Sequence, residues 1–352
     1  MNARPDNAGG GATALLEVRD LRKYFPVRGG ILNRAVAWVQ AVDDIDLDVL
    51  PGEVLGIVGE SGCGKSTTAR LLMHLIRADA GRIVFDGEPV QPDDAAGLRE
   101  LRRQMQMVFQ DSYSSLNPRL PIEDTIMFGP KVHGVSSAEA RERARELFSL
   151  VGLDPAQFIR RYPHELSGGQ RQRVNIARAL ALEPRLLILD EAVSALDKSV
   201  EAQVLNLLLT LRRELGLTYI FISHDLNVVQ YMSDRVLVMY LGKVVEIGPT
   251  AEIYRRMQHP YTEALLSAMP SMDPDRRTET PPLVGDPPNP IDPPPGCRFH
   301  TRCRFAEDVC RRAEPPLGPA AGQEAANGQG ADHLVACHMR VAASGHSLAP
   351  AG

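Results

Sequence analysis

The clearest chemical signal in the sequence is a glycine-rich stretch that lies between an apolar run and a helical one. Residues 59–67 read GESGCGKST and fit the pattern G-x-x-x-x-G-K-[ST]. Glycines let a backbone wrap around phosphate groups, so that N–H groups and a helix N-terminus face the negative charge. We expect Lys65 to reach the β- and γ-phosphates of a nucleotide and Ser66 to ligate Mg²⁺. The nucleotide-binding residues of this stretch are then Gly59, Glu60, Ser61, Gly62, Cys63, Gly64, Lys65, Ser66 and Thr67.

Two adjacent carboxylates follow a second apolar run. The stretch LLILDE at 186–191 predicts a buried strand that ends in Asp190 and Glu191. At the end of such a strand Asp190 would face the Mg²⁺, and Glu191 could orient and deprotonate a water molecule. An acidic pair after a strand is a weak signal alone, but it becomes a strong one together with a phosphate loop.

A third motif, LSGGQ at 166–170, stands at the start of a predicted helix. Its hydroxyl and N–H donors suit an anion. They are supplied by Ser167, Gly168, Gly169 and Gln170. In combination with the phosphate loop and LLILDE, this motif resembles the nucleotide-binding subunits of ABC transporters. The resemblance covers about residues 15–270.

The resemblance implies roles for further residues. Gln110, in MVFQD, matches a glutamine that contacts Mg²⁺ and the attacking water beside the groove for the membrane subunit. Asp197, in SALD, matches a loop that crosses the dimer interface. His224, in FISHD, matches a histidine that contacts the γ-phosphate. Phe25 is expected to stack on adenine, with Tyr24 as the alternative.

The resemblance therefore implies a site for ATP and Mg²⁺. The implied catalytic residues are Lys65, Gln110, Glu191 and His224, and the implied Mg²⁺ ligands are Ser66, Gln110 and Asp190. Many members of the family have Pro-Thr after the second carboxylate, whereas this chain has Ala192 and Val193. Both carboxylates are intact despite this departure, so it does not argue for an inactive site.

The pattern of apolar residues predicts an α/β fold over residues 14–270. The resemblance implies the P-loop NTPase fold of an ABC ATPase domain, with a RecA-like core, an antiparallel β subdomain and a helical subdomain. The expected strands are 15–18, 54–58, 82–85, 186–189, 219–222, 236–239 and 244–246. The expected helices are 65–76, 137–151, 170–182, 199–215 and 261–268.

The composition changes on both sides of this ATP-binding domain. Residues 1–13 are expected to be a disordered tail. Residues 271–296 are rich in proline and predict an extended linker. A small Cys-rich extension follows at 297–340, interrupted by an expected mobile loop at 318–330. The last residues, 341–352, are expected to be a frayed tail.

The overall charge and hydropathy limit the possible partners and location. The chain has 352 residues, with 39 Lys and Arg against 44 Asp and Glu, which gives a net charge of −5. So small a charge argues against a nucleic-acid-binding protein. No apolar run approaches the ~18 residues that span a bilayer, and residues 1–14 lack the apolar core of a secretory signal. We therefore expect a soluble cytoplasmic protein, or one held at a membrane only through a partner. The resemblance to ABC transporter subunits implies a peripheral location on the cytoplasmic face of the inner (plasma) membrane.

Four of the five cysteines fall near the C-terminus, at Cys297, Cys303, Cys310 and Cys337. Four thiolates suit an iron–sulfur cluster or tetrahedral zinc, but zinc sites usually contain a tight C-x2–4-C pair, which is absent here. The spacing resembles a motif that ligates a [4Fe–4S] cluster in some oligopeptide-importer ATPases. Zinc, with His300 or His338 in place of a thiolate, and unligated thiols are the alternatives. The neighbouring Arg298, Arg302, Arg304, Arg311 and Arg312 are expected to be solvated or to offset the charge of a cluster.

Further segments are similar to one branch of the ABC family, the dipeptide/oligopeptide importers. These segments are QDSYSSLNPR at 110–119, HPYTEALLSAMP at 259–270, DEAVSALD at 190–197 and the N-terminal excursion at 25–45. The last two are more similar to the F-type ATPase subunit of this branch than to its D-type partner.

This branch implies that the chain is the ATP-hydrolysing, energy-coupling subunit of an importer for di- or oligopeptides, nickel, opines or glutathione. The implied partners are a second, D-type ATPase subunit in a nucleotide-sandwich dimer, two integral-membrane permease subunits and an extracytoplasmic substrate-binding protein. The alternative is a soluble ABC-type ATPase that serves translation or DNA repair. Such proteins typically carry paired cassettes or a long coiled coil, and this chain has one cassette and no sustained heptad pattern.

Overall fold

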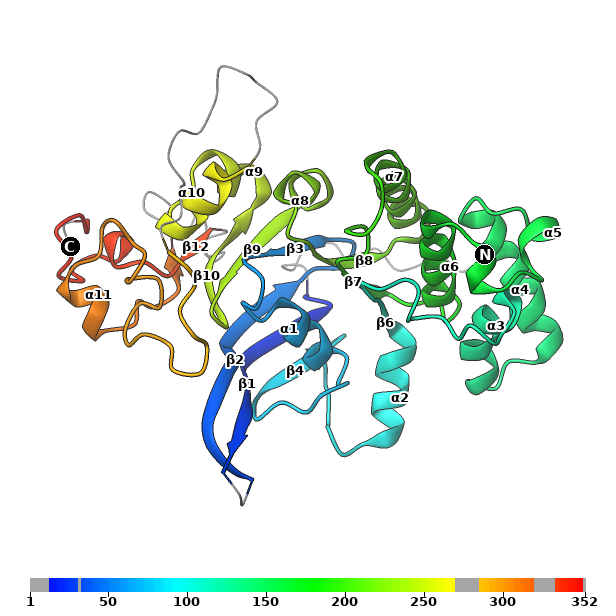
Figure 1. Cartoon of the computed structure of the whole chain (residues 1–352), viewed down its shortest axis with the longest axis horizontal. Helices are drawn as coiled ribbons and strands as arrows, with labels where there is room; N and C mark the ends of the chain where they lie inside the picture. Colours follow the sequence, from blue (N-terminus) through cyan, green and yellow to red (C-terminus); the bar gives the residue numbers. More distant parts are fainter. Residues whose placement is uncertain (1–12, 31–32, 270–284, 320–332, 351–352) are drawn as a thin grey trace.

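The chain folds around two β-sheets in the computed structural model, which describes residues 13–30, 33–269, 285–319 and 333–350. The larger sheet runs through the middle of the molecule, and a group of helices lies at one of its ends (Figure 1). Three predicted segments fall largely outside the described residues: the disordered tail at 1–13, the first half of the linker at 271–296 and the loop at 318–330.

Five parallel strands form the centre of the larger sheet. In chain order its strands are β3 (Val54–Val58), β6 (Met105–Val108), β7 (Leu186–Asp190), β8 (Thr218–Ile222), β9 (Arg235–Tyr240), β10 (Lys243–Pro249), β11 (Gly318–Pro319) and β12 (Leu334–Val335). The parallel strands lie in the order β9-β3-β8-β7-β6, and β10, β12 and β11 continue the sheet antiparallel beyond β9. β3, β7 and β8 are buried at every position, as expected for parallel strands with both faces covered.

The smaller sheet is antiparallel, in the order β2-β1-β4-β5. Its strands are β1 (Leu16–Gly29), β2 (Arg34–Val49), β4 (Ala80–Phe85) and β5 (Glu88–Pro89). Alternate side chains of β3 point to opposite faces of the larger sheet. Leu55 and Ile57 pack in the core shared with the smaller sheet and with α1 (Lys65–Leu72), whereas Val54 and Val58 pack in the core shared with the helices.

The helical layer contains the helix that begins in the LSGGQ motif. This helix, α6 (Gly168–Leu180), contacts α3 (Ile122–Val132), α4 (Ser137–Leu150) and α7 (Lys198–Leu215). The other helices are α2 (Ala95–Gln104), α5 (Pro155–Phe158), α8 (Leu226–Met232), α9 (Thr250–Arg255), α10 (Pro260–Ser267) and α11 (Asp308–Arg312). Within the described ranges, no helix combines the length and the apolar character needed to cross a bilayer.

All expected strands and helices are present. The strand expected at 54–58 has the predicted ends, and the other elements differ at one or both ends. The strand expected at 15–18 extends to Gly29 because β2, which was not predicted, pairs with it as a long hairpin. The helix expected at 65–76 ends four residues early as α1, since His74 has a φ of +48°, which is incompatible with helix. β6 and α3 were also not predicted.

The C-terminal extension is continuous with the ATP-binding domain, because β12 pairs with β10 of the larger sheet. The expectation of a frayed tail is wrong for residues 341–350. His346 is buried, and its Nε2 lies 2.9 Å from the carbonyl oxygen of Phe305. The Ser347 N–H donates to the Glu307 carboxylate at 3.0 Å. These contacts hold the end of the described chain against the extension.

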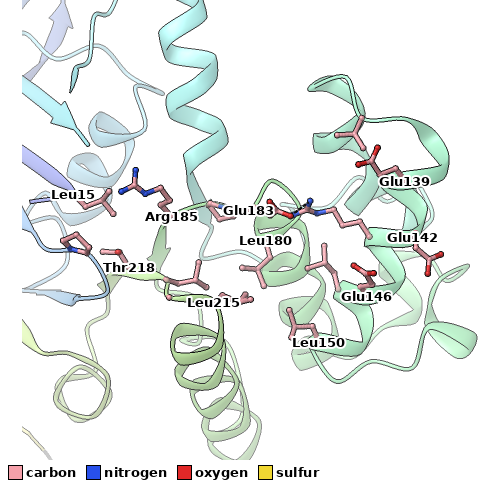
Figure 2. A pocket seen from close by; sticks show the side chains of 17 residues that line it. Leu15, Glu139, Glu142, Glu146, Leu150, Leu180, Glu183, Arg185, Leu215 and Thr218 are labelled. Carbon is pink, nitrogen blue, oxygen red and sulfur yellow. Dashed lines mark ion pairs between the residues drawn. The ribbon is translucent and has the colours of Figure 1, made fainter. Parts of the chain in front are cut away.

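A cleft of 1080 Å³ separates α4 from the N-terminal ends of the parallel strands (Figure 2). Glu139 and Glu146 of α4 lie on one side, and Thr218, the first residue of β8, lies on the other. Arg143 joins α4 to the loop after α6 through an ion pair with Glu183 at 2.7 Å. Parallel sheets of this kind place their ligands at the carboxyl ends of the strands. The cleft therefore lies at the opposite edge from the residues expected to bind nucleotide.

Candidate active site

The residues expected to handle nucleotide lie on loops that leave the carboxyl ends of adjacent parallel strands. The glycine-rich loop follows β3, and Gln110 lies two residues after β6. Asp190 ends β7, and His224 lies two residues after β8. Because the carboxyl ends of parallel strands meet at one edge of a sheet, the fold brings these four loops together.

The glycine-rich loop has a backbone shape that only glycine can adopt at two positions. Gly59 has a φ of +151° and Gly64 a φ of +111°. A Cβ atom would lie 2.2 Å from the Met239 carbonyl oxygen at Gly59, and 2.2 Å from the Ala41 carbonyl oxygen at Gly64. Backbone atoms cannot move aside to relieve such contacts. The loop leads directly into α1, whose N-terminus favours a bound anion.

The side chain of Lys65 lies inside the glycine-rich loop. The residue is buried, and its Nζ donates to the carbonyl oxygens of Gly59 at 2.7 Å and Glu60 at 3.1 Å. Burial raises the pKa of the neighbouring Cys63 thiol, which favours its neutral form. Phosphate oxygens would give the ammonium group charged partners in place of neutral carbonyls, and charge-assisted hydrogen bonds are stronger. Lys65 therefore lies within the loop that is expected to bind the phosphates.

Ser66 and Asp190 form the part of the site that suits Mg²⁺. The Ser66 hydroxyl donates to Asp190 Oδ1 at 2.9 Å, and both residues line a cleft of about 400 Å³ together with Gln110. Burial raises the pKa of Asp190, and a nearby cation would offset that effect. No group of three or more His, Cys, Asp or Glu in the described residues could hold a metal ion. Mg²⁺ is usually bound through one or two carboxylates plus phosphates and water.

Glu191 is the point at which three polar side chains meet. Gln110 Nε2 donates to Glu191 Oε2 at 2.8 Å, and His224 Nδ1 lies 3.4 Å from the same oxygen. Glu191 has a φ of +48°, in the left-handed region that is uncommon for a residue with a side chain. Its N–H donates to the Ile222 carbonyl oxygen at 2.9 Å. An uncommon backbone conformation and two polar neighbours thus position this carboxylate, and a general base would need such positioning.

The β1–β2 hairpin brings an exposed aromatic ring close to the glycine-rich loop. Phe25 is exposed and pairs with Val39, two residues before Ala41, whose carbonyl group contacts the loop. Tyr24 instead donates its hydroxyl to Asp43 at 2.5 Å, and burial together with this bond raises the pKa of Tyr24 to about 12. Of the two candidates for stacking on adenine, Phe25 is the one that presents its ring to solvent.

The LSGGQ motif lies apart from this cluster. The Ser167 hydroxyl accepts the N–H of Gln170 at 3.3 Å, and the Gln170 side chain accepts the N–H of Ser167 at 3.0 Å, which caps α6. Asp197 precedes α7 and is exposed. In the described part of the chain, no hydrogen bond or ion pair joins LSGGQ or Asp197 to the glycine-rich loop. Gly168 and Gly169 form the first turn of α6.

Two arginines of the C-terminal extension contact the ATP-binding domain, and sequence reasoning missed both contacts. Arg298 is buried and donates to Asp43. Arg302 forms an ion pair with Glu60 of the glycine-rich loop, with 2.7 Å between Nη1 and Oε2. Solvation, one of the two expectations for these arginines, is therefore wrong for both. No local signal marks them, because their partners lie 255 and 242 positions away in the sequence.

The four C-terminal cysteines line one small cavity, together with His259 and Phe299. Burial raises the pKa of Cys297 to about 12 and that of Cys337 to about 11, and the neighbouring thiols add to both shifts. Among the described residues, however, no three of these side chains have the spacing of metal ligands. The fold therefore gathers four thiols around one cavity, but it does not present a preformed metal cage.

Models of two protein families match the chain. The first, described as ABC transporter, matches residues 42–194. The second, described as oligopeptide/dipeptide transporter, C-terminal region, matches residues 245–310. The second match covers α9, α10 and the first three C-terminal cysteines.

Curated relatives match nearly the whole chain. A probable peptide ABC transporter ATP-binding protein of Sinorhizobium fredii is 48% identical over 96% of this chain and 93% of its own length. The oligopeptide transport ATP-binding protein AppF of Bacillus subtilis is 47% identical over 92% of this chain and 97% of its own length. A putative peptide import ATP-binding protein of Brucella ovis is 50% identical over 87% of this chain and 94% of its own length.

Solved structures share the fold of the ATP-binding domain. The ABC transporter component cbiO1 of Clostridium perfringens superposes with a TM-score of 0.60 at 30% identity, over 69% of this chain and 91% of that chain. The ATP-binding cassette MJ0796 is described as a dimer in a post-hydrolysis state with ADP and Pi. It has a TM-score of 0.58 at 27% identity, over 67% of this chain and 98% of that chain.

Fold and site together define the class of this protein as an ATP-binding cassette, in which one edge of a parallel sheet carries the nucleotide chemistry. The likeness to curated relatives then settles the family. The chain belongs to the ATP-binding proteins of ABC importers that carry the oligopeptide/dipeptide transporter C-terminal region. It is an ATPase subunit that uses ATP and Mg²⁺. The matched C-terminal region is one of transporters, which gives no support to the alternative of a soluble ATPase in translation or DNA repair.

Proposed function

We propose that the chain couples ATP hydrolysis to the import of di- or oligopeptides, or of a small peptide such as glutathione, on the cytoplasmic face of the inner membrane. The Sinorhizobium and Bacillus relatives are described as peptide and oligopeptide transport proteins. A Pectobacterium atrosepticum relative, 51% identical over 82% of this chain and 47% of its own length, is described as a glutathione import protein. Nickel and opines are the alternative substrates.

The observation that carries the ATP-hydrolysing part of this proposal is the convergence of Gln110 and His224 on one carboxylate oxygen of Glu191. Glu191 would orient a water molecule and accept its proton as the water oxygen bonds to the γ-phosphorus. The bond from that phosphorus to the oxygen bridging the β-phosphate would break, so that ADP leaves. Gln110 and His224 hold that carboxylate in place. Lys65 would neutralise charge on the phosphates. Ser66, Gln110 and Asp190 would hold Mg²⁺, which supplies further charge neutralisation when it is bound.

A second ATPase subunit would complete the site. Ser167 of the LSGGQ motif is exposed at the N-terminus of α6, and in the described residues the motif forms no hydrogen bond or ion pair with the chain's own glycine-rich loop. We infer that it faces the nucleotide held by a D-type partner, with Asp197 at the interface between the subunits. The dimeric form described for a solved relative supports this arrangement. Two permease subunits and an extracytoplasmic binding protein would form the rest of the importer, and nucleic acid has no part in it.

Reconstitution in proteoliposomes tests the proposal. The chain is purified from native membrane with its associated subunits, and ATP hydrolysis is measured with the binding protein loaded with a dipeptide, a longer peptide, reduced glutathione or Ni²⁺. We expect one peptide class to stimulate hydrolysis, and Lys65→Ala to remove the stimulated activity. If the chain associates with no membrane subunit and hydrolyses ATP equally well alone, it is not the energy-coupling subunit of an importer.

We also propose that Cys297, Cys303, Cys310 and Cys337 bind a [4Fe–4S] cluster in a structural role, with zinc as the alternative. The shared cavity supports this proposal, although the side chains would have to move closer to act as ligands. Anaerobically prepared protein should absorb near ~400 nm, and Ser at any of the four positions should abolish that absorbance, whereas Cys63→Ser should not. Colourless protein with one zinc per chain would favour zinc, and metal-free protein with a protease-resistant extension would exclude both.

A further inference from the structure

The C-terminal extension reaches the glycine-rich loop through one arginine. We propose that Arg302 is a positioning residue for this loop: by holding Glu60 it maintains the loop geometry that binds the phosphates of ATP. The inference rests on the proposed assignment of residues 59–67 to those phosphates. It gives the extension a role in nucleotide affinity, in addition to any role of its cysteines.

The contact between Arg302 and Glu60 is bidentate. Arg302 Nη1 lies 2.7 Å from Glu60 Oε2, and Nη2 lies 3.1 Å from Oε1. The Arg302 side chain is only 5% exposed, and its Nη1 also lies 3.4 Å from the Tyr240 hydroxyl. A planar guanidinium that forms two parallel hydrogen bonds fixes the direction of a carboxylate as well as its distance. Glu60 is therefore held in one orientation.

The backbone of Glu60 is held as well, by a residue of α10. Its N–H donates to the hydroxyl of Tyr261, a fully buried residue of α10, at 2.8 Å. The Tyr261 ring packs against Tyr240 and Phe299, with centroid distances of 4.6 Å and 5.4 Å. Phe299 lies three residues before Arg302 in the extension. The same packed unit thus holds both the side chain and the backbone of Glu60.

The position of Glu60 matters to the nucleotide site because Lys65 depends on it. The Glu60 carbonyl oxygen accepts a hydrogen bond from Lys65 Nζ at 3.1 Å. The adjacent Gly59 lies so close to the Met239 carbonyl oxygen that the loop has little room to shift without losing its shape. Without Arg302, the Glu60 carboxylate would be partly buried and would lack this partner. This favours loop conformations in which the carboxylate turns towards water. The phosphate-binding geometry would then be populated less often.

The test compares ATP affinity and turnover in four variants of the full-length protein. We expect Arg302→Ala to raise the KM for ATP about 5- to 50-fold, within the usual range of coupling between sites, and to change kcat at saturating ATP less than about twofold. Arg302→Lys should restore part of the affinity, because lysine keeps the charge but not the two parallel bonds. Glu60→Gln should weaken ATP binding similarly, and the double variant should lose little more than either single one.

A matched control lies two residues further on. Arg304 is an exposed arginine of the same extension that pairs with Glu263 on the surface, so Arg304→Ala should leave the KM unchanged. Because coupling between sites is reciprocal, ATP should slow tryptic cleavage of the extension in the wild type and in Arg304→Ala, but less so in Arg302→Ala.

The outcomes separate this inference from the proposed ATP site. If Lys65→Ala weakens ATP binding but Arg302→Ala leaves the KM at the wild-type value, the positioning role is overturned and the ATP site stands. The role is also overturned if Arg302→Ala lowers kcat and thermal stability while the KM is unchanged, since that describes general destabilisation. If Lys65→Ala has no effect on ATP binding, the assignment of the loop itself fails.

Discussion

Gln110 and Glu191 lie 81 positions apart in the sequence, yet the side-chain amide of the first donates to the carboxylate of the second at 2.8 Å. The pairing of β6 with β7 explains the contact, because Val108 lies opposite Leu189 and each strand ends beside the other. The residues that follow the two strands therefore meet at the sheet edge. The position of the proposed base depends on this register, which a one-residue slip would destroy.

Replacing this carboxylate should stop turnover without preventing nucleotide binding. A positioned general base contributes about 10²–10⁴-fold to a rate, so Glu191→Gln should lower kcat by about that factor and accumulate an ATP-bound dimer. Glu214→Gln, at an exposed position near the end of α7, is the control and should keep wild-type activity. Steady-state ATPase assays with equilibrium ATP binding measure both effects. Retention of more than about a tenth of the rate would remove Glu191 from the role of base.

The separation of LSGGQ from the glycine-rich loop predicts that activity depends on association. Specific ATPase activity should rise with protein concentration, or on addition of the proposed D-type partner, because each proposed composite site would need a motif from both subunits. Dilution series with sedimentation at matched concentrations check this directly. Activity that stays constant into the monomeric range would mean that one chain forms a complete site.

Much of the core architecture could be predicted because three of the parallel strands, β3, β7 and β8, are buried at every position and consist largely of apolar residues. The runs at 54–58 and 186–189 are buried on both faces, and such strands appear in a sequence as uninterrupted apolar stretches. The chemistry follows from this, since the glycine-rich loop and the carboxylate pair come directly after those runs. Their local sequence is enough to place them at one sheet edge.

The long hairpin and the contacts of the extension could not be predicted in this way. β2 has several exposed positions and an irregular register with β1, so its apolar residues do not alternate cleanly. The pairing of Arg302 with Glu60 joins residues 242 positions apart. Nothing in the sequence around Arg302 indicates that its partner lies in the glycine-rich loop.

The hairpin leads to a test of adenine recognition. Base–aromatic stacking contributes about 1–3 kcal/mol, so Phe25→Ala should weaken ATP binding by roughly 5- to 150-fold, whereas Phe25→Trp should retain it. Tyr24→Phe removes the hydroxyl that bonds Asp43 but keeps the ring, and should change stability more than affinity. Fluorescent-nucleotide titrations and thermal unfolding give the two readouts. If Tyr24→Ala weakens ATP binding and Phe25→Ala does not, the assignment of the stacking residue is reversed.

The two glycines of LSGGQ differ in their surroundings, which predicts different effects of adding a methyl group. At Gly169 a Cβ atom would lie 2.3 Å from Val200 Cγ1 of α7, whereas at Gly168 it would lie 3.5 Å from Leu196 Cδ2, an ordinary contact. Valine in a helix has one strongly preferred rotamer, so it cannot turn away easily. Gly169→Ala should destabilise the protein by about 1–3 kcal/mol through overpacking.

Thermal unfolding of the purified chain checks this difference between the glycines. Gly169→Ala should lower Tm by roughly 2–4 °C for each kcal/mol lost, and Gly168→Ala should lower it less. Adding Val200→Ala to Gly169→Ala removes the clashing methyl groups, so the double variant should recover part of the lost stability relative to Gly169→Ala. Because this compensation acts only through the packing of α6 on α7, it separates a steric role of Gly169 from any contact with nucleotide. If the double variant is less stable than both single variants, close packing against Val200 is not the reason for glycine at this position.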